Sequence, residues 1–252
     1  MMELFNIRGK KAIVTGGSRG LGKGMAQGLH DAGVELVLMG TNETVITTAK
    51  EMDSSEARTY GVIADFKEEE DVRKAFYEAL EFLGDIDILV NNAGMQIRHP
   101  SVEFPLRDWE LVLAVNLTSV FLLSQLAGKI MLEKNSGKII NIASLLSFSG
   151  GYTVPAYAAS KGGIAQLTKA LSNEWAAGGI NVNAIAPGYM DTDNTAEIKQ
   201  DPKRYAQILE RIPAGRWGSP DDLIGALIFL SSQASDYVNG SILSVDGGWM
   251  GR

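Results

Sequence analysis

The stretch Ala12-Ile-Val-Thr15-Gly16-Gly-Ser-Arg19-Gly20-Leu-Gly22 decides how this chain folds. It joins a short aliphatic run, typical of a buried strand, to the start of an amphipathic helical pattern. The glycines at positions 16, 20 and 22 let the backbone turn tightly before the helix begins. Because the first turn of a helix has free N–H groups and the positive end of the dipole, the stretch predicts a strand-turn-helix unit that binds a diphosphate.

Short apolar runs alternate with longer amphipathic runs along the rest of the chain. Seven runs predict strands: Ala12–Thr15, Glu35–Met39, Tyr60–Ile63, Ile86–Val90, Lys138–Ile142, Ile180–Ile185 and Ile242–Val245. Six predict helices: Gly22–Ala32, Glu43–Met52, Glu68–Leu83, Asp108–Lys134, Pro155–Ala177 and Pro220–Ser231, with Asn42, Asp108 and Ser219 as expected N-caps. Alternation of this kind implies parallel strands joined by right-handed crossovers, so we expect an α/β fold, a doubly wound parallel sheet of about seven strands with helices on both faces.

Composition narrows the possible functions. The 252 residues carry a net charge of -7 and 45% hydrophobic residues, and the pI is near 5.0. Such a chain can bury a sizeable core, and it lacks the clustered positive charge of nucleic-acid binders and polybasic membrane-surface proteins. The absence of cysteine excludes disulfides, a zinc-thiolate site and a cysteine nucleophile. We expect a soluble cytoplasmic protein with no metal site, no nucleic-acid partner and no segment that approaches the length of a membrane span.

Tyr157 and Lys161 lie four residues apart within a predicted helix and therefore share one face of it. A phenol beside an ammonium group is a candidate acid/base, because the positive charge favours the phenolate and lowers the pKa of the tyrosine. The alternative is a half-buried tyrosine next to a lysine that reaches for solvent.

Several separate motifs, in a consistent order, resemble the classical short-chain dehydrogenase/reductase family over essentially the whole length. They are the G-x-x-x-G-x-G turn at residues 16–22, Asn91-Asn-Ala-Gly94, Asn116 in Val115-Asn-Leu-Thr-Ser119, Ser144, Tyr157-x-x-x-Lys161 and Pro187-Gly188. The resemblance implies a single NAD(P)-binding domain of Rossmann type over residues 1–252, with a substrate-loop insertion at about 188–211 that is placed like a lid.

The resemblance also implies catalytic roles for Asn116, Ser144, Tyr157 and Lys161. Tyr157 is expected to act as the general acid in ketone reduction and the base in alcohol oxidation, while Ser144 hydrogen-bonds the substrate oxygen. Lys161 is expected to hold the nicotinamide ribose and to lower the pKa of Tyr157. Asn116 would anchor a water that passes protons from solvent.

Binding of NADP(H) or NAD(H) is expected at residues drawn from six parts of the chain. They are Gly16, Ser18, Arg19, Gly20, Leu21, Gly22, Thr41, Asp65, Asn92, Ala93, Gly94, Tyr157, Lys161, Pro187, Gly188, Met190 and Thr192. The predicted second strand is followed by Gly40-Thr41-Asn42, without the acidic residue that NAD-preferring members place there, and Arg19 suits a phosphate, so NADP(H) is favoured. Arg19 as a solvated loop residue, and Asp65 as a cap for a helix starting near Lys67, remain the alternatives.

The C-terminal third is most similar to members that act on sugar acids, with 2-deoxy-D-gluconate or 2-dehydro-3-deoxy-D-gluconate as expected substrates. Ser144, Gln96, Arg98, Tyr189 and Asn194 are the candidate substrate residues, with Arg98 for the carboxylate. Arg98 as a surface arginine is the alternative, and Arg216 is expected only to brace its loop.

Other functions stay open: a gluconate 5-dehydrogenase, a 3-oxoacyl-carrier-protein reductase, or a nucleotide-sensing module without catalysis. A homotetramer that pairs the helices at 108–134 and 155–177 is expected from the resemblance.

Overall fold

The computed structural model describes residues 2–53, 58–192, 195, 198 and 200–252. In this part of the chain seven parallel strands form one sheet in the order β3-β2-β1-β4-β5-β6-β7. The strands are β1 Lys11–Thr15, β2 Glu35–Gly40, β3 Thr59–Ile63, β4 Ile88–Asn91, β5 Gly137–Ile142, β6 Ile180–Pro187 and β7 Ile242–Val245. All seven predicted strands are therefore confirmed.

The winding direction of the sheet reverses beside β1. Ile13 pairs with Val37 of β2 on one side and with Leu89 of β4 on the other. The segments that follow β1 and β4 leave the same carboxyl edge in opposite directions, which is the arrangement that forms a crevice in open α/β sheets. Ligands of open α/β sheets bind at such a switch point, which places the glycine turn and Asn91–Gly94 where a cofactor is expected.

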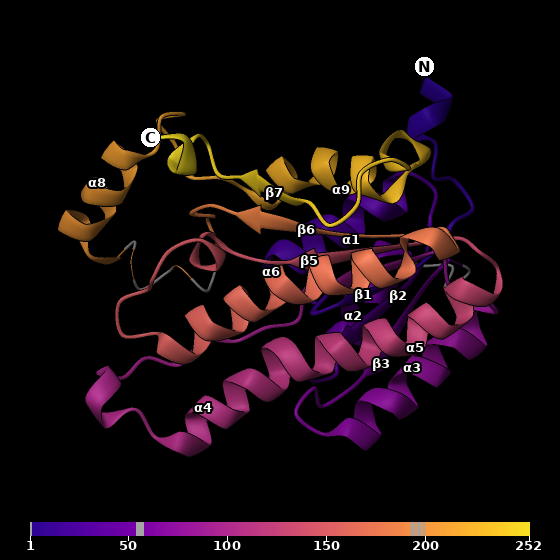
Figure 1. The fold of residues 1–252 in the computed structure, drawn as a ribbon, viewed down its shortest axis with the longest axis horizontal. Helices are drawn as coiled ribbons and strands as arrows, with labels where there is room; N and C mark the ends of the chain where they lie inside the picture. Colours follow the sequence, from indigo (N-terminus) through magenta and orange to yellow (C-terminus); the bar gives the residue numbers. More distant parts are fainter. Residues whose placement is uncertain (1, 54–57, 193–194, 196–197, 199) are drawn as a thin grey trace.

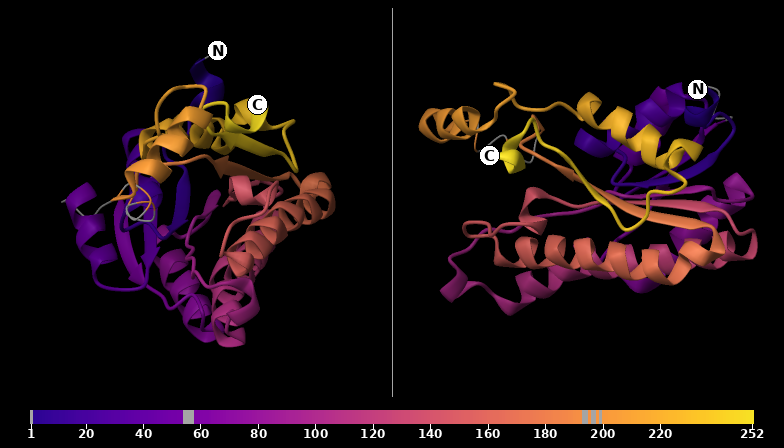
Figure 2. Two further views of the ribbon diagram at one scale, coloured as in Figure 1. Left: turned by 90° about the vertical axis from the view of Figure 1, so that its left-hand side faces the viewer. Right: turned by 45° about the horizontal axis from the view of Figure 1, so that its top comes forward.

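Helices cover both faces of the sheet (Figure 1). They are α1 Gly20–Asp31, α2 Thr44–Met52, α3 Glu69–Leu83, α4 Leu106–Leu113, α5 Ser119–Glu133, α6 Pro155–Trp175, α8 Pro202–Arg211 and α9 Ile224–Ser231. The core is split accordingly, because side chains alternate along each strand: Ile13 packs with α3, α5 and α6, whereas Val14 packs with α1, α2 and α9. Figure 2 shows the resulting layers, with α8 projecting at one end.

The predicted helix at 108–134 is longer than expected and is interrupted. A π-helical turn, Ala114–Thr118, joins α4 to α5. The combined stretch Leu106–Glu133 has 28 residues and contains an apolar window with a mean hydropathy of 1.8, so it is long and apolar enough to cross a membrane by length and composition alone. Our expectation that no segment reaches that length was wrong, because a helix that packs against a sheet needs the same apolar residues. More than half of the apolar window is buried inside the protein.

Two of the three predicted caps act near helix starts. The Ser219 hydroxyl and the Asp222 carboxylate form a capping box before a 3-10 helix, Pro220–Leu223, that leads into α9. Oδ1 of Asn42 accepts a hydrogen bond from the backbone N–H of Thr44 at 3.0 Å. The prediction for Asp108 was wrong. It lies inside the first turn of α4, and its Oδ2 is 2.8 Å from Nε2 of His99, because the helix already begins at Leu106.

Candidate active site

The glycine turn has the backbone shape that its sequence predicts. Gly16 and Gly20 have φ angles of 65° and 52°, in the left-handed region that favours glycine. A Cβ atom on Gly22 would collide with the carbonyl group of Gly16 and the side-chain amide of Asn92. Position 22 therefore has room for glycine alone, because the turn packs closely against the amino end of α1.

The end of β4 holds this turn in place. The Thr15 hydroxyl accepts hydrogen bonds from the backbone N–H groups of Asn92 and Ala93, both at 2.9 Å. The Asn92 amide donates to the carbonyl groups of Thr15 at 2.9 Å and Gly16 at 3.2 Å. On the other side, Thr48 donates to the carbonyl of Ser18 at 3.2 Å. The two segments at the switch point are thus fixed as one unit. Asn91 itself points into the core, where its amide donates to Ser124 and Asn141.

The segment after β6 closes over the glycine turn. Pro187 ends β6, and the N–H of Gly188 donates to the carbonyl of Val245 at 2.9 Å. Met190 forms an isolated parallel bridge with Gly218. Thr192 then comes so close to the turn that its side chain lies 3.8 Å from where a Cβ of Gly20 would be. The segment after β6 therefore lies beside the glycine turn, although the two are far apart in sequence.

Lys161 is buried beneath Tyr157. Its Nζ lies 5.7 Å from the centre of the Tyr157 ring and donates to the carbonyl oxygen of Ile142 at 2.5 Å. Burial disfavours the charged form and lowers the pKa of Lys161 to about 8. The amine can therefore give up or take back a proton close to neutral pH.

The expected effect of Lys161 on Tyr157 is wrong for this structure. Desolvation by the surrounding protein raises the pKa of Tyr157 above its ordinary value, and only the hydrogen bond with the Ser144 hydroxyl acts in the opposite direction. Nζ of Lys161 is not among the groups that shift this pKa, and it donates to the Ile142 carbonyl. Tyr157 is consequently a protonated phenol at neutral pH, which is the form that can donate a proton.

Asn116 faces inward because it lies in the π-helical turn, and such turns are frequent at functional sites. Its amide N–H groups donate to the carbonyl of Met95 at 2.8 Å and to the hydroxyl of Ser160 at 3.1 Å. Its Oδ1 accepts from the N–H of Met95 at 2.8 Å. Ser160 in turn donates to the carbonyl of Tyr157 at 2.8 Å. Asn116 thus joins the loop after β4 to α6. The sequence analysis did not identify Met95 and Ser160 as the hydrogen-bond partners of Asn116.

Ser144 lies just beyond β5, at the start of a 3-10 helix, Leu145–Ser147. Its Oγ accepts from the N–H of Leu146 at 3.1 Å, and its hydroxyl group hydrogen-bonds the Tyr157 phenol. The two candidate donors to a substrate oxygen therefore meet at the same point. The Ser144-x-x-Ser147 spacing, which is that of a capping box, is the sequence signal that could have added Ser147 to the candidates.

At the adenosine end of the predicted site, β2 ends at Gly40 and Thr41 is exposed. Asp65 is not a helix cap, since α3 begins only at Glu69. Desolvation acts to raise the pKa of Asp65, but hydrogen bonds and an ion pair with Lys67, at 3.0 Å, outweigh it and lower that pKa. Its carboxylate stays ionised and about two-fifths exposed.

The candidate substrate residues are less closely gathered. Arg98 is exposed, and its Nη1 makes a long contact of 3.5 Å with the carbonyl of Tyr152. Gln96 is partly buried on the same loop. Tyr189 packs its ring against Trp217 and Trp249, with ring centres 5.4 and 4.7 Å away. Asn194 lies outside the described residues. Arg216 pairs with both carboxylate oxygens of Asp222 at 2.7 Å, so it braces its loop as expected.

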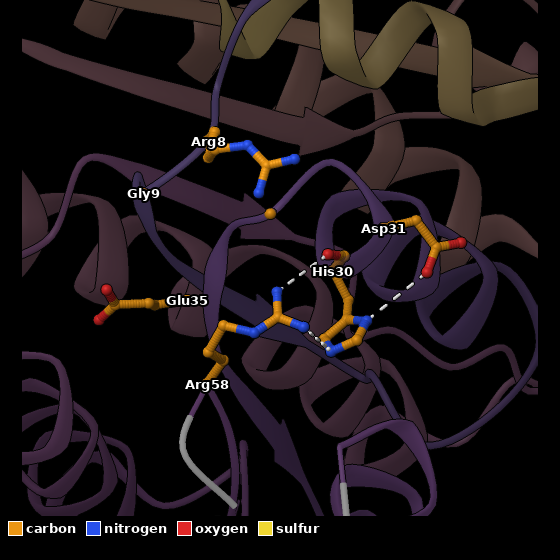
Figure 3. Close-up of a pocket in the computed structure, with 7 residues that line it drawn as sticks. Arg8, Gly9, His30, Asp31, Glu35 and Arg58 are labelled. Atoms are coloured by element: carbon orange, nitrogen blue, oxygen red, sulfur yellow. Dashed lines mark hydrogen bonds and ion pairs between the residues drawn. The ribbon is translucent and has the colours of Figure 1, made fainter. Parts of the chain in front are cut away.

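Two cavities of the protein lie away from the glycine turn and from Ser144, Tyr157 and Lys161. A cavity of about 460 Å³ lies at the amino ends of the strands, opposite the glycine turn, and is lined by Arg8, His30 and Arg58 among others (Figure 3). Within it, Nη2 of Arg58 lies 3.0 Å from Nε2 of His30. A smaller cavity of about 320 Å³ adjoins α8, with Tyr189, Arg211 and Trp249 in its wall.

Comparisons with known proteins agree with this geometry. A family model described as "Enoyl-(Acyl carrier protein) reductase", of the short-chain dehydrogenase type, matches residues 16–250. The chain is similar to the 2-dehydro-3-deoxy-D-gluconate 5-dehydrogenases of Bacillus subtilis, 51% identical over 99% of this chain and 98% of that protein, and of Escherichia coli, 48% identical over the full length of both.

Two solved structures have the same fold with a TM-score of 0.95. One is a putative NAD(P)-dependent gluconate 5-dehydrogenase from Beutenbergia cavernae with bound NADP, 43% identical over 99% of this chain and 100% of that chain. The other is a gluconate 5-dehydrogenase from Burkholderia cenocepacia in complex with NADP and tartrate, 40% identical over 100% and 99%. From its motifs, its sheet and these relatives, the chain belongs to the short-chain dehydrogenase/reductase family.

Proposed function

We propose that this protein is an NAD(P)-dependent oxidoreductase that interconverts a secondary hydroxyl group and a ketone on a sugar acid of the 2-dehydro-3-deoxy-D-gluconate or 2-deoxy-D-gluconate type. The observation that carries the proposal is the meeting of the Ser144 and Tyr157 hydroxyls above a buried Lys161, beside a glycine turn shaped for a diphosphate. Relatives about half identical over the full length, with names of this activity, support the substrate class.

The chemistry of these residues suits a nicotinamide dinucleotide. The glycine turn would receive the diphosphate at the free N–H groups of α1, and Thr192 with Gly188 would flank the nicotinamide end. When bound, the nicotinamide supplies or accepts the hydride. The predicted cofactor residues from Gly16 to Thr192 keep these roles as proposals.

Tyr157 donates its proton to the ketone oxygen, since its raised pKa keeps the phenol protonated at neutral pH. Ser144 donates a hydrogen bond to the same oxygen as negative charge develops on it. Lys161, with a pKa of about 8, can then return a proton toward Tyr157. Asn116 uses both amide donors within the protein, so a relay water would meet the second lone pair of its Oδ1 or its backbone carbonyl.

NADP(H) is the favoured cofactor. The end of β2 carries no acidic residue, and Arg19 and Thr41 offer a guanidinium and a hydroxyl for a phosphate. The Beutenbergia and Burkholderia structures were both obtained with NADP.

Arg98 is proposed to bind the substrate carboxylate, with Gln96, Tyr189 and Asn194 for hydroxyl groups. Its guanidinium has five N–H donors, and within the described part of the chain one of them makes the long contact with Tyr152, so the others can form a two-point contact with a carboxylate. A gluconate 5-dehydrogenase activity is a second candidate, because gluconate 5-dehydrogenases are among the similar structures.

A carrier-protein reductase is less well supported. An acidic carrier protein needs a basic surface near the site, and Lys134 is instead paired with Asp85 and Asp87 at 2.8 and 3.1 Å, at the opposite edge of the sheet. A sensing module would not need the complete set of Ser144, Tyr157 and Lys161.

Initial rates decide between these functions. Purified protein is assayed with 2-keto-3-deoxy sugar acids, 5-ketogluconate and acetoacetyl thioesters, each with NADH and NADPH. We expect turnover of the sugar acids, with NADPH preferred. Turnover of thioesters alone would refute the sugar-acid proposal, and equal rates with both nucleotides would refute the cofactor preference.

We further propose a cytoplasmic homotetramer of one-domain chains, residues 1–252, with the substrate loop at about 188–211 and no nucleic-acid or membrane partner. Phe121 on α5 is 44% exposed, and Gly162 on α6 faces open space among the described residues, which supports helix pairing between copies. Light scattering after gel filtration tests the assembly, and a Phe121→Glu variant is expected to dissociate it.

A further inference from the structure

Ser147 connects the loop that carries Ser144 to the helix that carries Tyr157. Its Oγ donates to the carbonyl oxygen of Lys161 on α6 at 2.7 Å. The same Oγ accepts from the backbone N–H of Ser144 at 3.3 Å. A serine hydroxyl has one donor and two acceptor lone pairs, so it can form both hydrogen bonds at once. Ser144 and Lys161 are 17 residues apart in sequence, and the Ser147 side chain bridges them through backbone groups at both ends.

The other polar links between this loop and α6 use groups that the proposed reaction needs. The Ser144 hydroxyl bonds the Tyr157 phenol, yet both hydroxyls must turn to the same substrate oxygen. Nζ of Lys161 bonds the carbonyl of Ile142, and it must turn toward the cofactor ribose and Tyr157. The two hydrogen bonds of Ser147 involve no reacting atom. They can therefore persist while substrate is bound, when the direct Ser144–Tyr157 contact is lost.

We infer that Ser147 is a positioning residue, which holds the backbone of Ser144 at a set distance from α6 so that the Ser144 and Tyr157 hydroxyls converge on one substrate oxygen. The inference rests on the proposed function, because it assigns Ser147 a part in the same reaction. Placement errors of about 1 Å in a site of this kind are costly to the rate.

The test compares Ser147→Ala with Ser149→Ala. Ser149 is in the same loop, and its hydroxyl donates to the carbonyl of Leu145 at 3.2 Å, within the loop itself. We expect Ser147→Ala to lower kcat roughly tenfold, the value of one well-placed hydrogen bond, with cofactor affinity unchanged. Ser149→Ala should stay within about twofold of the wild type, and Ser147→Thr, which keeps the hydroxyl, should recover most of the rate.

The pH profile of alcohol oxidation gives a second readout. Oxidation needs the phenolate form of Tyr157, and the hydrogen bond from Ser144 lowers the pKa of that phenol. Loosening Ser144 should therefore move the ascending limb of the profile to higher pH in Ser147→Ala but not in Ser149→Ala. A purely structural role would reduce the amount of active enzyme, measured by cofactor binding, and would leave the limb where it is.

A wild-type kcat in Ser147→Ala would overturn the inference. So would a loss of activity that equals the loss of cofactor-binding sites, with the ascending limb of the pH profile unchanged. If Ser147→Ala does not fold, Ser147→Cys gives the same comparison with a weak donor of similar size. Failure of the proposed function is distinguishable, because wild-type enzyme would then reduce a substrate outside the sugar acids. The Ser147 comparison would still be decided with that substrate.

Discussion

Replacing Asn116 with alanine should lower the stability of the protein as well as its kcat. The side chain is 1% exposed and makes three hydrogen bonds, two with the backbone of Met95 and one with Ser160. At about 1 kcal/mol for each bond, the variant should lose about 3 kcal/mol of unfolding free energy. Because a protein of this size shifts its melting temperature by about 2–4 °C per kcal/mol, the midpoint should fall by roughly 6–12 °C.

Thermal unfolding followed by circular dichroism measures this shift, and kcat is measured on the same sample well below the midpoint. Ser160→Ala is the graded control, since it removes the link to Tyr157 but leaves the two bonds with Met95, and it should cost about 1–2 kcal/mol. A melting temperature of Asn116→Ala within about 2 °C of the wild type, together with a lower kcat, would contradict this reasoning. Asn116 would then serve the reaction alone, and its hydrogen bonds with Met95 would add nothing to the unfolding free energy.

Four further predictions concern the proposed cofactor site, the acid/base pair of Tyr157 and Lys161, and Arg98 as the proposed partner of the substrate carboxylate. Tyr157→Phe should lower kcat by about 10²–10⁴-fold with cofactor binding retained, and more than a tenth of wild-type activity would contradict its proton-transfer role. Gly22→Ala should weaken NADPH binding at least about tenfold because its Cβ meets Gly16, measured by fluorescence titration, whereas Gly225→Ala, with no neighbour within 4 Å among the described residues, should bind normally. Lys161 has a folded pKa of about 8 against 10.5, so the unfolded chain binds more protons between these values and wild-type stability should rise with pH there. The difference in unfolding free energy between Lys161→Met and the wild type, measured in denaturant titrations, should accordingly shrink by about 1 kcal/mol per pH unit from pH 8 to 10. A constant difference would refute the burial argument. Arg98→Leu should raise the KM for a sugar acid about tenfold or more with little change for the nicotinamide, and an unchanged KM would place the carboxylate elsewhere.

Local patterns predicted the framework of the protein well. Each predicted strand is present, because buried parallel strands are short aliphatic runs that are legible in sequence. The glycine turn was also predictable, since the positive φ angles of Gly16 and Gly20 are what glycine at those positions permits. The start of α4 was misplaced because Asp108 resembles a cap, whereas its carboxylate is engaged by His99 in the folded chain.

The sequence by itself determined the alternating α/β pattern, the glycine turn and the shared helix face of Tyr157 and Lys161, all of which follow from residue spacing. Only the tertiary structure decided the chemistry of that pair. Desolvation by the surrounding protein raises the pKa of Tyr157, where spacing alone predicted a fall, and the Ser144 hydroxyl only partly opposes it. The Lys161 amine donates to the carbonyl of Ile142 on β5, a contact that exists only in the folded chain. The links from Asn116 to Met95 and from Ser147 to Lys161 have the same origin, since hydrogen bonds between distant segments exist only once the sheet has brought their ends together.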